Sequence, residues 1–161
     1  MKILVSVIVS ATTLAMSNAV GGEWEDGYAA YEHQDYVTAA GKWRVVADRG
    51  DRAGQSIMGA MYAQGQGVPQ DYAIALKWYR LAAAQGEVKA QYKLGFMYAN
   101  GQGVPRALAR SYMWSYQAAA AGHKEAEKIR DSAEKAMNLE QFATAKRLAL
   151  RCQQRKFQGC E

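Results

Sequence analysis

The chain of 161 residues contains only two histidines and two cysteines, so it is poor in the side chains that build most zinc sites. His33 and His123 are isolated, and neither has a second histidine at the spacing of a catalytic zinc pair. The cysteines form no Cys-x-x-Cys motif. We therefore expect no metal and no other cofactor, and we interpret both histidines as loop or surface residues.

The chain also lacks a long hydrophobic run. Its one apolar stretch, 3–16, is shorter than the ~20 residues that a membrane span requires. Lys2 precedes this stretch and Ser17-Asn18-Ala19 follows it, as in a secretory signal peptide that is cleaved after Ala19. No cysteine follows, which excludes a lipid anchor there. We predict a signal peptide over 1–19, a periplasmic or secreted bacterial protein and no stable membrane insertion after cleavage; the alternative is an uncleaved N-terminal anchor.

Cys152 and Cys160 are separated by seven residues at the end of this apparently exported chain. Disulfides form and persist in exported proteins, and a bridge here would stabilise the fold by about 2–3 kcal/mol. Two free thiols or a metal pair are the alternatives, and no metal-binding spacing supports the second. We predict a disulfide between Cys152 and Cys160.

The positive charge is modest, because the formal net charge of +5 falls to +4 when Lys2 leaves with the signal peptide. This value does not argue for nucleic acid. The C-terminal region is more basic than the rest and contains Lys146, Arg147, Arg151, Arg155 and Lys156. An anionic lipid or an acidic partner surface could bind there. The alternative is a solvated helix face whose cations interact favourably with the helix dipole.

Proline is scarce as well, and the only two prolines mark a repeat. Residues 59–69 read Gly-Ala-Met-Tyr-Ala-Gln-Gly-Gln-Gly-Val-Pro, and residues 95–105 differ from them at only two of eleven positions. The offset is 36 residues. A fixed period of this length predicts a stacked repeat architecture, which exposes a long surface and rarely encloses a deep polar pocket.

Each period predicts two helices. Met58, Met61 and Tyr62 lie at helical spacing, and the same stripe recurs 36 residues later. Glycines and a proline then end the first helix, and the second runs from about Asp71, a plausible N-cap, to Gln85. Such a helical hairpin covers its apolar face only when the next hairpin stacks on it.

The pattern closely resembles the Sel-one-like repeat (SLR), a relative of the tetratricopeptide repeat. The residues that carry the resemblance are Met58-Gly59, Met61-Tyr62, Gly65, Gly67-Val68-Pro69, Asp71-Tyr72, Trp78-Tyr79-Arg80, Ala82-Ala83 and Gly86, with Leu94-Gly95, Met97-Tyr98, Gly101, Gly103-Val104-Pro105, Trp114, Ala118-Ala119 and Gly122 in the next copy. The resemblance implies an all-α, right-handed solenoid of stacked hairpins. It also implies a protein that binds another protein without catalysis, as an adaptor, a regulator or a toxin-immunity protein.

We expect a single domain over 20–161. Its predicted parts are a short first hairpin at 27–50, repeats at 53–86 and 89–122, and capping helices with a tail at 123–161. Asn138 and Gln141 resemble a capping box that opens the last helix. Ala107 stands where the first repeat has Asp71, so the second repeat lacks an evident N-cap.

In tetratricopeptide-like arrays the first helix of each hairpin lines a concave groove. The resemblance places ten residues of this chain in such a groove: Glu32, His33, Ser56, Ala60, Gln64, Tyr92, Phe96, Asn100, Lys128 and Ser132. Tyr92 and Phe96 are one turn apart on a face that the core stripe does not use. They are either exposed anchors for a partner or packing residues against the neighbouring hairpin.

One motif points to catalysis instead. Ser132 and Lys135 have the Ser-x-x-Lys spacing of penicillin-recognising enzymes. The companion motifs Ser-Asp-Asn and Lys-Thr-Gly are absent, and residues three apart share a helix face in any case. We therefore predict no catalytic residues, with a cell-wall-directed enzyme of the penicillin-recognising or β-lactamase type as the alternative.

Overall fold

The computed structural model describes the backbone of residues 10–160 and the side chains of residues 21–160. This part of the chain contains eight helices and no strand: α1 (Ser10–Glu32), α2 (Tyr36–Asp48), α3 (Arg52–Gln64), α4 (Tyr72–Ala84), α5 (Val88–Asn100), α6 (Leu108–Ala120), α7 (Lys124–Lys135) and α8 (Leu139–Gln154). None of these helices has both the length and the apolar character needed to span a membrane. Residues 1–9 of the predicted signal peptide lie outside the described residues.

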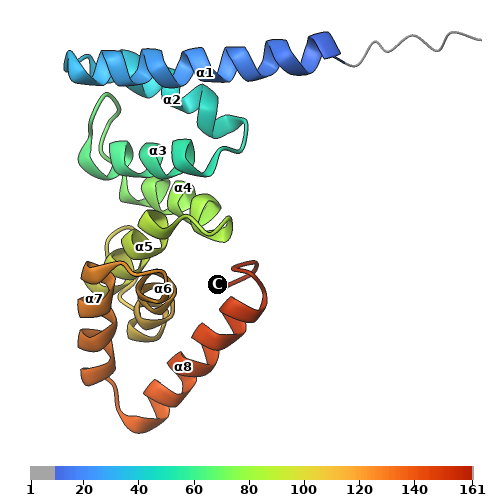
Figure 1. The fold of residues 1–161 in the computed structure, drawn as a ribbon. Coiled ribbons are helices and arrows are strands. Elements are labelled where there is room, and N and C mark those ends of the chain that lie inside the picture. Colours follow the sequence, from blue (N-terminus) through green and yellow to red (C-terminus); the bar gives the residue numbers. More distant parts are fainter. Residues whose placement is uncertain (1–9, 161) are drawn as a thin grey trace, which may run out of the picture.

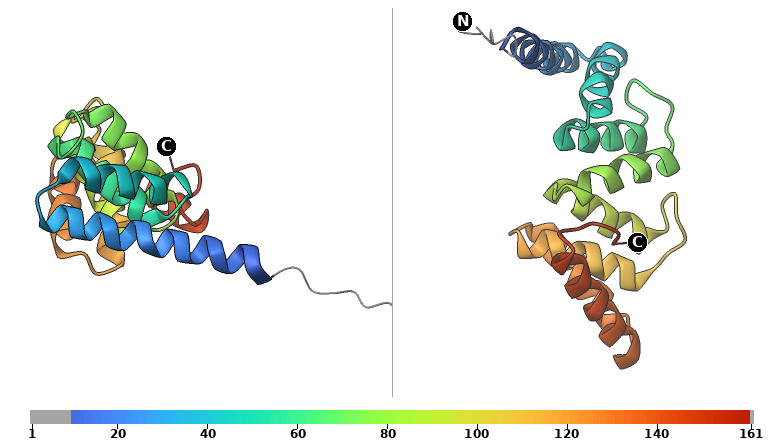
Figure 2. Two further views of the ribbon diagram at one scale, coloured as in Figure 1. Left: turned by 90° about the horizontal axis from the view of Figure 1, so that it is seen from above. Right: turned by 90° about the vertical axis from the view of Figure 1, so that its right-hand side faces the viewer.

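The helices stack in chain order, each packing on the next from α1 to α7 (Figure 1). Three successive hairpins, α1–α2, α3–α4 and α5–α6, form the array. The first helices of neighbouring hairpins also contact each other, α3 with α5 and α5 with α7. The predicted all-α solenoid of stacked hairpins is confirmed. The N-terminal part of α1 projects beyond the stacked hairpins (Figures 1 and 2).

The last two helices do not close a fourth hairpin like the others. Both α7 and α8 pack against α6, and they diverge from each other (Figure 1). The buried Gln117 of α6 donates a 2.7 Å hydrogen bond from Nε2 to the carbonyl of Ala149 in α8. Asn138 and Gln141 form the predicted capping box at the start of α8. The two helices thus cover opposite sides of α6 and end the array.

The chain after α8 turns back toward the end of α4 (Figure 2). Gln158 donates a 2.7 Å hydrogen bond from Nε2 to the carbonyl of Ala84. The predicted disulfide between Cys152 and Cys160 is present, and both sulfur-bearing residues are buried in the core that α4, α5, α6 and α8 share. The bridge therefore fixes the tail to α8.

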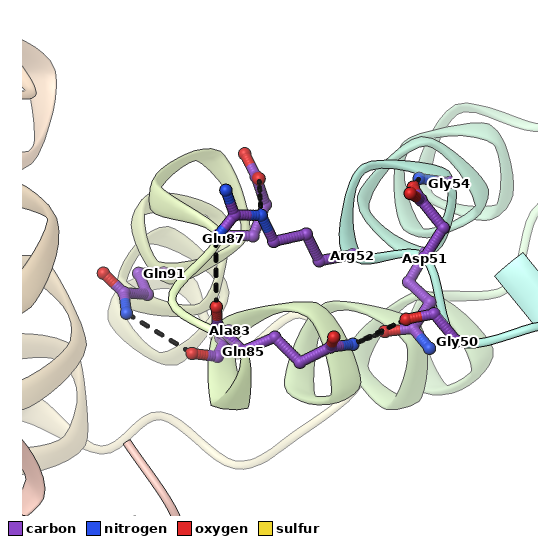
Figure 3. Close-up of polar contacts among 9 residues, drawn as sticks. Gly50, Asp51, Arg52, Gly54, Ala83, Gln85, Glu87 and Gln91 are labelled. Atoms are coloured by element: carbon purple, nitrogen blue, oxygen red, sulfur yellow. Dashed lines mark hydrogen bonds and ion pairs between the residues drawn. The ribbon is translucent and has the colours of Figure 1, made fainter. Parts of the chain in front are cut away.

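A buried glutamine links each repeat to the preceding hairpin. Gln55 donates from Nε2 to the carbonyl of Ala47 at 3.3 Å. At the equivalent position 36 residues later, Gln91 donates to the carbonyl of Ala83, also at 3.3 Å (Figure 3). Gln85 adds bonds to the carbonyl of Gly50 at 3.0 Å and to Oε1 of Gln55 at 2.9 Å. The carbonyls of Ala47 and Ala83 also accept hydrogen bonds from the backbone N–H groups of Gly50 and Gly86, so each glutamine adds a second bond at the end of the preceding hairpin.

The glycine-rich loop between the helices of a repeat also contacts the previous hairpin. A Cβ at Gly67 would overlap the backbone of Tyr36 at the start of α2, and one at Gly103 would overlap the backbone of Tyr72 at the start of α4. Both glycines have positive φ, +70° and +67°. These glycines therefore do more than end the first helix of the repeat, because each loop also packs on the preceding hairpin.

Inside the hairpins, Gly59 and Gly95 allow close helix packing, as their places in the helical pattern suggested. A Cβ at Gly59 would lie 2.7 Å from the ring of Tyr79, and one at Gly95 would overlap Oγ of Ser115. A larger residue at either position would push the second helix of the hairpin away from the first.

The equivalent helices α4 and α6 have different residues at the N-cap position. Asp71 caps α4 by accepting hydrogen bonds from the backbone N–H groups of Ala73 and Ile74, at 2.8 and 2.9 Å. Ala107 occupies the N-cap position of α6, and no side chain there bonds to the N–H groups of the first turn, as the sequence indicated. The two caps have nearly the same backbone conformation, with φ −152° and ψ 105° at Asp71 and φ −146° and ψ 97° at Ala107.

We therefore expect Ala107→Asp to stabilise the protein by about 1 kcal/mol, because the new carboxylate would satisfy unpaired N–H groups at the start of α6. Denaturant unfolding of both proteins measures the difference. Ala107→Asn should give most of the same gain without a charge. If neither substitution raises the unfolding midpoint, the start of α6 is satisfied by other means.

Candidate protein-binding surface

Four of the ten predicted groove residues lie together in one hollow between α5 and α7. Phe96 and Asn100 come from the second half of α5, and Lys128 and Ser132 come from the middle of α7. The hollow has a volume of about 340 Å³. Its remaining lining residues are Ala99, Arg106, Leu108, Ile129, Ala133 and Ala136. We call this surface the α5–α7 hollow.

Phe96 is the main apolar group of the α5–α7 hollow, and 39% of its surface is exposed. Asn100 donates a 2.8 Å hydrogen bond from Nδ2 to the backbone carbonyl of Phe96, which fixes the Asn100 side chain against the preceding turn of α5. Lys128 and Arg106 carry positive charge at the edge, and neither forms an ion pair with another described residue. An aromatic group beside unpaired cations is suited to a partner with apolar and acidic side chains.

Tyr92 is not an exposed anchor, which corrects that prediction. Its ring stacks on the ring of His123 with centroids 4.3 Å apart, and it packs against Ala118, Ala119 and Ala126. His123 itself caps α7, with Nδ1 accepting a hydrogen bond from the N–H of Ala126. The alternative interpretation holds for Tyr92, because its ring packs against α6 and the start of α7.

Ser56 was also predicted in the groove, and its burial contradicts this prediction. It occupies the position 36 residues before Tyr92 and is only 9% exposed. The fifth residue of the first helix is therefore largely covered in both repeats.

The other predicted groove residues lie outside the α5–α7 hollow. Ala60 is half-buried against the core, and Gln64 is exposed at the end of α3. Glu32 and His33 are exposed where α1 turns into α2. The structure thus gathers only four of the ten residues in one hollow, in the C-terminal half of the array between α5 and α7, and partner binding by the exposed Gln64, Glu32 and His33 stays a prediction.

Sequence reasoning missed Arg106 and Leu108, although the repeats contained a signal for them. The equivalent positions in the first repeat are Gln70 and Tyr72, and Phe96 itself stands where the first repeat has Ala60. Asn100 likewise stands where the first repeat has Gln64, so four lining residues from the second repeat differ from their counterparts in the first. A residue-by-residue comparison of the two copies would have brought them together.

The enzymatic alternative depends on Ser132 and Lys135. Both side chains are exposed on α7, and no hydrogen bond joins them in the described structure. A serine nucleophile needs a base within hydrogen-bond reach. Across residues 10–160, no three His, Cys, Asp or Glu side chains are grouped where they could hold a metal ion.

Two shifted pKa values belong to groups that hold the helices together. Burial raises the pKa of Tyr79, whose ring packs on Gly59 inside the α3–α4 hairpin. Hydrogen bonds to Asp26 and Glu23 raise the pKa of Lys42, which thereby links α2 to α1 at 2.9 and 3.1 Å. Neither group lines the α5–α7 hollow.

The stacked helical hairpins define an α-helical repeat protein, and a family model identifies the repeats. The model of the Sel1 repeat matches residues 53–87 and 88–123. The chain therefore contains two Sel1 repeats. Proteins with Sel1 repeats generally mediate protein–protein interactions, and the fold typically serves as a non-enzymatic scaffold.

Solved structures agree with this assignment. The chain resembles c5321, a protective antigen of uropathogenic Escherichia coli strains with an SLR fold, with a TM-score of 0.81 and 25% identity over 92% of this chain and 33% of that one. It also resembles a Sel1 repeat protein from Oxalobacter formigenes, with a TM-score of 0.64 and 28% identity over 78% of this chain and 54% of the other. The chain thus spans about a third and about half of these proteins. No curated protein matches its sequence.

Proposed function

We propose that the protein binds another protein through the α5–α7 hollow and acts without catalysis, as an adaptor, regulator or toxin-immunity protein in the bacterial periplasm. The observation that carries this proposal is the exposure of Phe96 inside a concave surface. A large apolar side chain in a hollow is the usual centre of a binding hot spot. The neighbouring Lys128 and Arg106 would orient an acidic part of the partner.

Phe96→Ala is expected to weaken binding to the partner by about 2 kcal/mol or more, which is roughly thirtyfold in affinity. The fold should be nearly unchanged, because Phe96 is substantially exposed. Leu139→Ala is the matched control, since Leu139 is 91% exposed and lies outside the hollow. The measurement is the dissociation constant of each variant for the partner captured from periplasmic extract.

Site-specific photo-crosslinking tests the surface independently of affinity. A photoreactive residue at position 100 in the hollow should crosslink to the partner, whereas one at position 37 should not, because the exposed Val37 lies at the start of α2. Equal crosslinking from both positions, or unchanged affinity of Phe96→Ala, would contradict the proposal. Assays of the purified protein on β-lactam and peptidoglycan substrates address the enzymatic alternative.

The periplasmic location is supported by the leader-like sequence and by the packing of α1. The predicted cleavage after Ala19 divides α1, and Glu23, Trp24 and Tyr28, which contact α2, lie beyond that point. Removal of the leader would therefore leave these contacts intact. The intact mass of protein from the periplasmic fraction should correspond to a chain that begins at Val20. Recovery of the full-length chain in the cytoplasm would refute export.

A further inference from the structure

A second hollow lies on the other side of α6, next to the disulfide. Its volume is about 200 Å³. Three arginines line it, Arg110 from α6 and Arg151 and Arg155 from the end of α8. Met113, Leu148, Cys152, Gly159 and Cys160 complete the lining. Arg110 and Leu108 are two positions apart on α6, so they project to nearly opposite sides of the helix, and this hollow is separate from the α5–α7 hollow.

Within the part of the chain that the structure describes, the three arginines pair with no carboxylate. No ion pair joins Arg110, Arg151 or Arg155 to an acidic side chain there. The helices α4, α5 and α6 contain no Asp or Glu, and α8 has only Glu140, in its first turn. Glu140 lines a different part of the surface. Three arginines thus line a hollow that has no acidic side chain among its described lining residues.

The hollow is also held in shape. The guanidinium group of Arg110 lies over the ring of Tyr98, 5.7 Å from its centroid, and the hydroxyl of Tyr98 accepts a 2.7 Å hydrogen bond from Nη2 of Arg80. On the other side, the disulfide fixes Gly159 and Cys160 against α8. Met113 and both cysteines are buried, and they form an apolar base below the charged rim.

We propose that this hollow binds an acidic segment of another protein, with one or two carboxylates on the arginines and an apolar side chain on the base. Guanidinium groups bind carboxylates through paired, charge-assisted hydrogen bonds, which favours carboxylates here. A recessed site with an apolar base fits a side chain of a peptide better than the headgroups of a flat lipid surface. This site is independent of the one in the α5–α7 hollow.

The test uses the disulfide-bonded protein and a capped peptide that alternates Glu with Leu, with a peptide that alternates Gln with Leu as control. Calorimetric titration should show saturable one-to-one binding of the Glu peptide and at least tenfold weaker binding of the Gln peptide. Nitrogen-15 NMR should show shifts of the Nε–H signals of Arg110, Arg151 and Arg155 when the Glu peptide is added.

A double variant identifies the site. Arg110→Gln with Arg155→Gln should weaken binding of the Glu peptide at least tenfold. Lys146→Gln with Arg147→Gln removes the same charge from another face of α8 and should change affinity less than twofold. Circular dichroism checks that both variants fold. If the first variant does not fold, the NMR shifts in the unmodified protein decide the question.

Several results would overturn the proposal. Equal weakening in both double variants would show a general charge effect and no defined site. Binding only to phosphatidylglycerol vesicles would assign the arginines to a lipid surface. Salt-sensitive self-association without peptide binding would assign them to a second copy of this chain. Absence of shifts at the three Nε–H signals would exclude the hollow altogether.

Discussion

Gly103→Ala is expected to destabilise the protein by about 2–5 kcal/mol. Gly103 has a φ of +67°, and a side chain in this left-handed region costs about 1–2 kcal/mol. The new Cβ would also overlap the backbone of Tyr72 at the start of α4, and such overpacking adds about 1–3 kcal/mol. Because the overlap is with backbone, it can be relieved only if the loop moves away from the preceding hairpin. Chemical denaturation of the variant measures the loss.

Gly122→Ala is the matched control for this experiment. Gly122 also has a positive φ, +89°, but no atom lies within 4 Å of the Cβ that it would acquire. Gly122→Ala should therefore destabilise the protein only by the cost of a side chain in the left-handed region, about 1–2 kcal/mol. The difference between the two variants measures the packing of the loop on α4. Equal losses would mean that the packing of the glycine-rich loop on α4 adds nothing to stability.

Leu94→Ala should destabilise the protein by about 2–5 kcal/mol, because Leu94 is completely buried in the core between α4, α5 and α6 and its loss leaves a cavity. Leu81→Ala is the control of the same chemistry, since Leu81 is 51% exposed on α4 and should cost less than about 1 kcal/mol. Both values come from denaturant unfolding followed by circular dichroism.

The contrast between Leu94 and Phe96 separates core from binding surface within one helix. Phe96→Ala should reduce partner binding while the protein stays folded. Leu94→Ala should lower the free energy of unfolding, and it should leave partner binding unchanged at temperatures where the variant is still native. Charge reversal by Arg151→Glu with Arg155→Glu tests whether the partner binds at the arginine-lined hollow. If this variant loses partner binding while Phe96→Ala binds normally, the partner binds at α8 and not in the α5–α7 hollow.

The sequence by itself determined the hairpin architecture and several local features. The 36-residue period, the Met58 and Leu94 stripes and the glycine-proline breaks specify helix pairs that must stack. The Asp71 cap, the missing cap at Ala107 and the capping box of α8 were readable because capping depends on residues within one turn. The disulfide was predictable because the chain has only two cysteines.

Only the tertiary structure decided which positions remain open to a partner. Tyr92 and Phe96 have similar places in the helical pattern, but Tyr92 packs under the next hairpin and Phe96 does not. The loop glycines contact the preceding hairpin, and α7 and α8 lie on different sides of α6, so each side has its own hollow. These features depend on how neighbouring hairpins pack. A repeating sequence pattern predicts that the hairpins stack, but it does not specify the angle and offset between neighbouring hairpins.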